Sequence, residues 1–264
     1  MVTRMSRPIV LLHLTDPHLF ATPDGRLRGV NTYETFRAVL EQARRSTRWP
    51  PDALLVTGDI VQDESRAGYE RFRSSLEPFG LPVYSIPGNH DDPALLEDVL
   101  RGGLFHAGGE ARFDGWSLIF LSTHLPGEDA GSLGEKRLHD LAAALAAHRG
   151  SHVLVVMHHH PLPLGSAWLD SVGLLDASAF LEVLDANPHV RGVLCGHVHQ
   201  ASDRERRGVR FLTTPSTCSQ FQPGSGSFAL DDRPPGMRWL LLHPDGFIET
   251  EVEWVGAPES ERPR

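Results

Sequence analysis

The chain lacks the features of a secreted, membrane-bound or disulfide-stabilised protein. Its 264 residues include only two cysteines, Cys195 and Cys218, and no apolar run long enough to cross a membrane. Two cysteines form no disulfide framework and fit a reducing compartment. The first residues carry no apolar segment typical of a signal peptide. We therefore expect a soluble, cytoplasmic protein without a membrane partner, in which Cys195 is a small buried hydrophobic residue.

The chain also lacks an excess of positive charge. Its formal net charge is −9 at pH 7, and nearly all of its basic residues are arginine. An acidic chain is a poor general binder of the nucleic-acid backbone, so we expect no nucleic-acid partner. A short basic run at residues 204–207 is interpreted as a solvated turn.

Short apolar runs alternate with segments of helical periodicity. Runs typical of buried strands occur at residues 9–14, 53–57, 83–86, 153–157 and 190–195. Helical spacing or helix-start signals occur at residues 31–45, 65–76, 93–96, 133–147 and 177–184. A hairpin is predicted at residues 111–121, and further strands at 209–213, 237–242 and 247–252. Residues 20–30 are predicted to be a loop.

This pattern predicts an α/β fold, called α+β in some schemes. We expect a four-layer α/β/β/α sandwich, in which two mixed sheets pack face to face with flanking helices. Residues 1–255 are expected to form a single domain, and residues 256–264 a flexible tail. The apolar C-terminal strands fit either the core or the interface of a homodimer.

Residues that commonly bind metals follow five of the predicted strands. They are Asp16 and His18, Asp59, Asn89 with His90 and Asp91, His158, and His197 with His199. Active sites form at the carboxyl ends of strands in α/β sheets, so we expect these side chains to meet at one edge. Taken singly, a histidine at a strand end or a Gly-Asn dipeptide is more often structural. The ordered series favours a metal centre.

The mixture of imidazole, carboxylate and amide groups suits Mn, Fe, Zn or Co better than Ca or Mg. The candidate ligands exceed the needs of one site but suffice for two sites that share a carboxylate, as in enzymes that carry out displacement at phosphorus. Two divalent cations, with Asp16, Asp59 and a hydroxide, leave about one positive charge. That charge suits a phosphate diester.

In this series the sequence resembles the calcineurin-like metallophosphoesterases. Their signature is Asp-x-His, Gly-Asp, Gly-Asn-His-Asp/Glu, a strand-ending His and Gly-His-x-His, and all five parts are present between Asp16 and His199. More closely, the chain is similar to the class III bacterial 3′,5′-cyclic-AMP phosphodiesterases. That closer match lies in residues 27–32, 158–163, 165–170, 194–200, 214–218 and 231–236.

The resemblance implies two divalent metal ions per chain and hydrolysis of 3′,5′-cyclic AMP to 5′-AMP by a hydroxide between the metals. The first metal would be held by Asp16, His18, Asp59 and His199, and the second by Asp59, Asn89, His158 and His197. The implied general acid is His90, with Asp91 as its orienting partner. The residues implied in substrate binding are His18, Asn89, His90 and His199, with Trp168 and His160 as further candidates.

Several alternatives stay open. The enzyme could instead have a broader range of phosphodiester substrates, or act on a 2′,3′-cyclic nucleotide or a glycerophosphodiester, because the ligand set does not separate these. A non-catalytic scaffold that binds a phosphorylated ligand is disfavoured, since the full ligand set is present. Trp168 could stack on a base or belong to the core. His124 is interpreted as structural, and the roles of His159 and His160 are left open. Loops at residues 126–133, 162–174 and 221–235 are long enough to wall a pocket.

Overall fold

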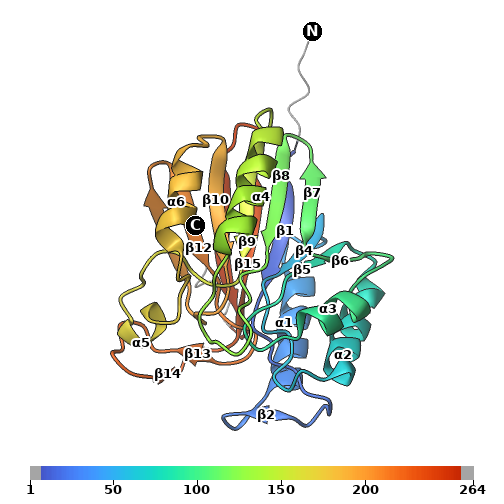
Figure 1. The fold of residues 1–264 in the computed structure, drawn as a ribbon. Coiled ribbons are helices and arrows are strands. Elements are labelled where there is room, and N and C mark those ends of the chain that lie inside the picture. Colours follow the sequence, from blue (N-terminus) through green and yellow to red (C-terminus); the bar gives the residue numbers. More distant parts are fainter. Residues whose placement is uncertain (1–6, 257–264) are drawn as a thin grey trace.

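Two six-stranded sheets face each other, and helices cover their outer faces (Figure 1). The computed structural model describes residues 7–256. The expected tail at residues 256–264 therefore lies, except for Gly256, outside the described residues. Within the described part of the chain, no helix has the length and apolar character needed to cross a lipid bilayer.

The first sheet has the strand order β16-β15-β1-β4-β5-β6. Its strands are β1 (Ile9–Leu14), β4 (Ala53–Val56), β5 (Val83–Ser85), β6 (Phe105–Ala107), β15 (Gly236–Leu242) and β16 (Ile248–Trp254). Strands β1, β4, β5 and β6 run parallel, whereas β15 is antiparallel to both β1 and β16. The sheet is therefore mixed, as expected.

The second sheet has the order β11-β12-β10-β9-β8-β7. Its strands are β7 (Gly109–Phe113), β8 (Trp116–Leu121), β9 (His152–Met157), β10 (Val190–Cys195), β11 (Ser202–Arg206) and β12 (Val209–Thr213). Its four central strands are parallel and its two edge strands are antiparallel. Two short hairpins complete the β structure, namely β2 (Arg26–Leu27) with β3 (Val30–Asn31) and β13 (Gln220–Phe221) with β14 (Leu230–Asp231).

The helices begin where the sequence offers side-chain caps. Asn31 caps α1 (Thr32–Arg45), Ser65 caps α2 (Arg66–Leu76) and Asp92 caps α3 (Pro93–Val99), each by accepting hydrogen bonds from backbone amides in the first turn. The remaining helical segments are the 3₁₀ turn η1 (Glu77–Phe79), α4 (Gly134–Ala147), α5 (Ala167–Asp170) and α6 (Ala177–Asp185). The capping signals are local, which is why the starts of α1 to α3 were predictable.

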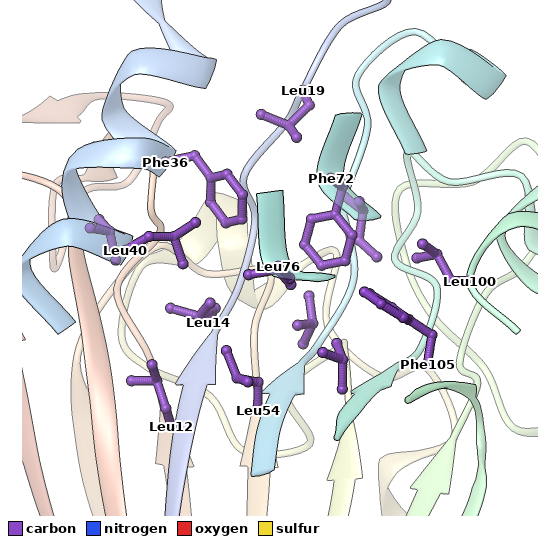
Figure 2. Close-up of a cluster of buried hydrophobic side chains, with 14 of the residues drawn as sticks. Leu12, Leu14, Leu19, Phe36, Leu40, Leu54, Phe72, Leu76, Leu100 and Phe105 are labelled. Carbon is purple, nitrogen blue, oxygen red and sulfur yellow. The ribbon is translucent and has the colours of Figure 1, made fainter. Parts of the chain in front are cut away.

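Three buried apolar clusters fill the spaces between four layers. The first joins the outer face of the first sheet to α1, α2 and α3, with Phe36 and Phe72 packed over Leu14 and Leu54 (Figure 2). The second lies between the two sheets, and the third joins the second sheet to α4 and α6. The four-layer α/β/β/α sandwich is confirmed. Four apolar residues of β15, namely Met237, Trp239, Leu240 and Leu242, belong to the first two clusters and so to the core.

Three details differ from the expectation. Residues 20–30 are not only a loop, because they contain β2 and the start of β3. Residues 204–206 lie in edge strand β11, so the interpretation of 204–207 as a turn was wrong for all but Arg207. Strand β6 was not predicted. Strands β6 and β11 are edge strands of the two large sheets, one short and one charged, and so lack the apolar alternation of a buried strand.

Candidate metal centre and active site

The predicted ligand residues meet at one end of the sandwich. Each follows the carboxyl end of a parallel strand: β1, β4 and β5 in the first sheet, and β9 and β10 in the second. The small elements β2, α5, β13 and β14 cluster at one end of the molecule (Figure 1). Residues separated by up to about 180 positions along the chain thus become neighbours.

One group of candidate ligands comprises Asp16, His18 and His199. The Nε2 atoms of His18 and His199 lie 3.2 Å apart, and Nε2 of His199 lies 3.4 Å from Oδ1 of Asp16. All three side chains are buried. The Nδ1 atom of His199 donates to the carbonyl of Ser219 at 2.6 Å, which leaves Nε2 free to face the group.

A second group comprises Asn89, His158 and His197. The amide oxygen of Asn89 lies 3.1 Å from Nε2 of His158 and 3.0 Å from Nδ1 of His197. The Nδ1 atom of His158 is hydrogen-bonded to the carbonyl of Thr57, so its Nε2 atom faces Asn89. The Nε2 atom of His197 is buried and has no hydrogen-bond partner among the described residues.

Asp59 lies between the two groups. Its Oδ2 atom is 3.8 Å from Nε2 of His18, and its Oδ1 atom is 3.5 Å from Nε2 of His158. Each oxygen of one carboxylate therefore faces a different group. The same Oδ1 atom also accepts a hydrogen bond of 2.9 Å from the backbone amide of His90.

These spacings fit metal binding. Ligand atoms about 2.1 Å from a shared ion stand roughly 3.0–3.4 Å from each other in octahedral or tetrahedral geometry. The contacts within each group fall close to that range. Groups such as Asp16, His18 and His199, or Asp16, Asp59 and His158, also bring three potential ligand atoms within 4.8 Å of one another. The buried cluster of histidine and aspartate side chains thus fits a divalent metal site.

The backbone at the ligands is strained. Asp16, His18, Asp59, His197 and His199 all have φ between 46° and 67°, in the left-handed region that side chains with a Cβ rarely adopt. Such conformations persist only where the surroundings enforce them, and they gather at functional sites. Asn89 and His158 are the two candidate ligands without a positive φ, so the strain is confined to the other five.

The electrostatics show what the cluster needs. Burial alone would raise the pKa of Asp59, but the His158 and His18 imidazoles hold that pKa well below its usual range. Burial alone would lower the pKa of His158, yet Asp59 raises it to about 9. Without a metal, a proton on His158 therefore supplies the positive charge that the buried carboxylates require. A divalent cation would replace that proton.

His90 lies beside the ligands and lines the cavity over them. Its ring centroid is 5.2 Å from that of His18. Its Nδ1 atom lies 3.2 Å from the amide nitrogen of Gln62, a residue that the sequence did not single out. Because Gln62 occupies Nδ1, the Nε2 atom is the one that can present a proton to the cavity. The Gln62 amide oxygen has no hydrogen-bond partner among the described residues, so amide rotation lets it accept from Nδ1 when the ring is doubly protonated.

Asp91 has a different set of contacts from the expected one. Its buried carboxylate accepts hydrogen bonds from the backbone amides of Ile60 and Gly88, at 3.1 and 2.9 Å, and from the hydroxyl of Tyr69 at 2.9 Å. Burial, together with Asp59, raises its pKa to about 6. Among the contacts of the described residues, none joins its side chain to the His90 ring. Asp91 joins the loop of Asp59 to the loop of Asn89 and His90.

The three consecutive histidines at positions 158–160 differ in their hydrogen-bond partners. His159 is hydrogen-bonded at both ring nitrogens, to Thr123 at 2.7 Å and to the carbonyl of Asp129 at 3.1 Å, which leaves neither free for a metal. His160 lies 3.6 Å from Asp170 and does not line the cavity over the metal cluster. Of the three consecutive histidines, His158 is thus the one that joins the ligand groups. His124 lines a separate hollow beside Asn89.

A cavity of about 300 Å³ opens over the cluster. Its floor includes His18, Asp59, Asn89, His90, His197 and His199. Its walls come from the β2–β3 hairpin, from α5 and from the segment after residue 218. Of the three loops expected to wall a pocket, those at residues 162–174 and 221–235 each supply at least two lining residues, and the loop at 126–133 supplies Asp129. Trp168 contacts Phe221 and Phe228 edge to face, and the Arg28 guanidinium lies 3.9 Å over the Phe228 ring. The β2–β3 hairpin in this wall was predicted to be a loop.

Comparison with known proteins assigns the family. Residues 9–201 match the model for calcineurin-like phosphoesterases. The chain belongs to this family. It is 42% identical over 243 residues to the 3′,5′-cyclic adenosine monophosphate phosphodiesterase CpdA of Escherichia coli (strain K12), covering 92% of this chain and 88% of that protein. It is 41% identical over 253 residues to CpdA of Vibrio vulnificus (strain CMCP6), covering 95% and 92% respectively.

A solved structure supports the fold. A dimetal phosphatase from Danio rerio aligns with a TM-score of 0.66 and 16% identity, covering 95% of this chain and all of that one. At this identity the likeness concerns the fold alone. It agrees with the two face-to-face sheets and flanking helices of the present chain.

Proposed function

We propose that this protein hydrolyses 3′,5′-cyclic AMP to 5′-AMP as a metal-dependent phosphodiesterase of the cytoplasm. The observation that carries the proposal is Asp59, whose two oxygens face two separate groups of buried ligands. The relatives with the highest identities cited above carry the name of a cyclic-AMP phosphodiesterase, and they match over most of the chain. The two free, buried cysteines are consistent with a reducing compartment.

Two divalent ions, drawn from Fe, Mn, Zn and Co, are proposed to share Asp59. Asp16, His18 and His199 would complete one site, and Asn89, His158 and His197 the other. When bound, such ions would activate a water as nucleophile and offset the charge of the phosphate. The protein itself holds the ligands in place by hydrogen bonds on their far nitrogens, as for His158 and His199.

His90 is proposed to hold the proton that the leaving 3′ oxygen receives. Its position on the cavity floor, with Gln62 at Nδ1, directs Nε2 to the substrate. His18, Asn89 and His199 line the same floor and are proposed to face the phosphate. Asp91 is proposed to act through the backbone of the two loops that it joins, and not by touching His90.

The cavity supports a small substrate. Its volume of about 300 Å³ lies at the lower end of the range for small-molecule pockets. Trp168, Phe221 and Phe228 give one wall an aromatic surface on which a nucleobase can pack. A cyclic mononucleotide presents both a phosphate for the floor and a base for that wall. A glycerophosphodiester would leave the aromatic wall unused.

A substrate panel tests the proposal. The metal-loaded protein would be assayed with 3′,5′-cyclic AMP, 2′,3′-cyclic AMP and glycerophosphocholine, and kcat/KM compared for each. We expect 3′,5′-cyclic AMP to be the best substrate and 5′-AMP its product. A higher kcat/KM for either rival would reject the substrate assignment, and no turnover of any diester would reject the activity itself. The Asp59→Asn variant controls for a contaminating phosphodiesterase.

A further inference from the structure

A row of buried polar side chains leads away from the metal cluster into the space between the sheets. It runs from Asp16 through Thr15, Thr57, His13 and Thr214, and it ends at Arg238. All six side chains are at least nine-tenths buried. His13 is on the face of β1 that also carries Ile9 and Leu11, residues of the cluster between the sheets. This row is a feature that neither the ligand geometry nor the family motifs explain.

The contacts in the row are continuous. Thr15 Oγ1 lies 2.5 Å from Asp16 Oδ2, and Thr57 Oγ1 lies 2.7 Å from Thr15 Oγ1. His13 reaches Thr57 through Nε2 at 2.8 Å and Thr214 through Nδ1 at 2.6 Å. No water is needed to join any two members. The row spans both sheets, because Thr214 follows β12 of the second sheet.

The Asp16 carboxylate and a neutral His13 ring determine the direction of the hydrogen bonds in the row. Arg238 can only donate, and its Nε atom donates to Thr214 Oγ1 at 3.3 Å. The single hydroxyl proton of Thr57 is used toward Thr15, so Thr57 accepts from Nε2 of His13, and Nδ1 of the neutral ring accepts from the Thr214 hydroxyl. Thr57 donates to Thr15, and Thr15 donates to Asp16, which as a carboxylate can only accept.

The charges agree with this direction. Burial lowers the pKa of His13 to about 3, which leaves its ring neutral at physiological pH. Burial also lowers the pKa of Arg238, to about 10, so the guanidinium stays charged. Its other nitrogens donate to Thr250 and to the carbonyls of Ser202 and Thr213. The row therefore has a cation at one end, an anion at the other and aligned dipoles between them, an arrangement that strengthens each bond.

The glycine of the Gly-His-x-His motif leaves room for the row. A Cβ atom on Gly196 would lie 2.1 Å from Thr15 Oγ1, 2.7 Å from Thr57 Oγ1 and 3.0 Å from Asp16 Oδ2. Gly196 has no positive φ that would require glycine for conformational reasons. A lack of space beside the row thus accounts for a glycine at this position.

We propose that Thr15, Thr57 and His13 form a hydrogen-bond relay that positions Asp16 and tightens the binding of a divalent cation. The proposal rests on the proposed function, in which Asp16 is a metal ligand. The backbone amide of His197 donates to both oxygens of Asp16, at 3.2 and 3.1 Å, and the Thr15 hydroxyl donates to Oδ2 alone. The other oxygen, Oδ1, lies 3.4 Å from Nε2 of His199 and faces the metal cluster. The relay residues are positioning residues and touch neither substrate nor metal.

Thr57 offers a discriminating pair of variants. Thr57→Val keeps the shape but removes the hydroxyl, whereas Thr57→Ser keeps the hydroxyl and removes a methyl group. The dissociation constant of Mn²⁺ would be measured on metal-free protein by competition with a chelating dye. We expect Thr57→Val to weaken Mn²⁺ binding by about tenfold, the usual scale for partners of metal ligands. Thr57→Ser should stay within about twofold of the wild type.

Ser117→Ala is the matched control, because it also removes a buried hydroxyl bonded to a histidine ring, that of His148 at 3.0 Å. It lies in β8 at the end of the sheet away from the cluster. We expect its Mn²⁺ affinity to equal that of the wild type. Thr15→Val, next to Asp16, should weaken binding more than Thr57→Val, and Thr214→Val, at the far end, should weaken it less. The unfolding temperature of each metal-free variant identifies any that do not fold.

The outcomes separate the relay from the proposed function. If the wild type binds no Mn²⁺, or if Asp16→Asn binds it as well as the wild type, the metal assignment fails. If the wild type binds Mn²⁺ and Asp16→Asn does not, but Thr57→Val and Thr15→Val match Ser117→Ala, the relay inference alone fails. Equal losses in Thr57→Val and Thr57→Ser would also overturn it, since that result indicates packing and not the hydroxyl. Should Thr57→Val not fold, Thr15→Val and Thr214→Val still decide.

Discussion

Both ends of the β-sandwich contain residues with positive φ, but different side chains stand at those positions. At the end away from the cluster, glycine takes this conformation in the turns at Gly115 (74°) and Gly246 (90°), and Arg207 (52°) takes it in the turn before β12. At the cluster end, Asp16, Asp59 and His197 adopt positive φ with their side chains intact. Glycine would relieve the strain there, but it would remove the ligand. The difference teaches that the cluster end keeps unfavourable backbone conformations in order to present metal-binding groups.

The largest effect is expected from removing the charge of Asp59 while keeping its shape. Asp59→Asn retains a residue that tolerates positive φ but weakens both metal groups at once. We expect kcat/KM to fall by about a thousandfold or more, because the proposed activation of the nucleophile by two metals would be lost. Metal content per chain, measured by mass spectrometry, should fall with it. A variant that keeps more than a tenth of the wild-type kcat/KM with both metals bound would contradict the shared role of Asp59.

His90→Ala, also at the cluster end, should slow the reaction without weakening metal binding. We expect kcat to fall by about 10²- to 10⁴-fold, the usual contribution of a general acid, with metal content unchanged. Steady-state kinetics and metal analysis on the same preparation would check this. A metal-free His90→Ala protein would show instead that His90 supports the cluster.

A pair of glycine substitutions compares the two ends directly. Gly115→Ala places a Cβ in open space at φ 74°, and we expect a loss of about 1–2 kcal/mol in the free energy of unfolding from backbone strain alone. Gly58→Ala, at φ 91°, would also bring its Cβ within 2.3 Å of the Gly88 amide nitrogen. We expect it to lose about 3 kcal/mol or more, because the backbone must shift as well. Urea denaturation of both variants measures the difference, and equal losses would show that the cluster end can relax.

The smallest effect is expected at the aromatic wall. Trp168→Ala should raise KM for 3′,5′-cyclic AMP by about tenfold, in line with the loss of one base-stacking contact. Phe247, an exposed aromatic residue at the opposite end, provides the control, and Phe247→Ala should leave KM unchanged. A raised KM in both variants, or in neither, would count against base binding by Trp168.

Local signals account for much of the fold. Strands β1 and β10 begin and end where their apolar runs do, and α1 begins after its Asn31 cap, because these signals act within a few residues. Strand β11 was missed because charged residues on an edge strand leave no apolar alternation. The β2–β3 hairpin was missed because two-residue strands carry too little pattern.

The candidate site divides in the same way. The candidate ligands could be named from the sequence, since each follows a predicted strand and lies in one of the five parts of the family signature. The contacts of Gln62 with His90, of Asp91 with two loops, and of His159 with Thr123 join residues across the fold and leave no local pattern. Motif position singles out His158 as the ligand, but the sequence leaves the roles of His159 and His160 open. The contacts of the three side chains differ in the folded structure.

The sequence by itself therefore determined the layer architecture and the family and named the candidate ligands at the strand ends, because apolar periodicity, caps and motifs are local. Only the tertiary structure decided that the two oxygens of Asp59 face different ligand groups, what His159 and His160 contact, and that a relay from Arg238 ends on Asp16. These are distances and hydrogen-bond directions between segments that meet only when both sheets pack together. A buried polar atom finds its partner in space and not along the chain.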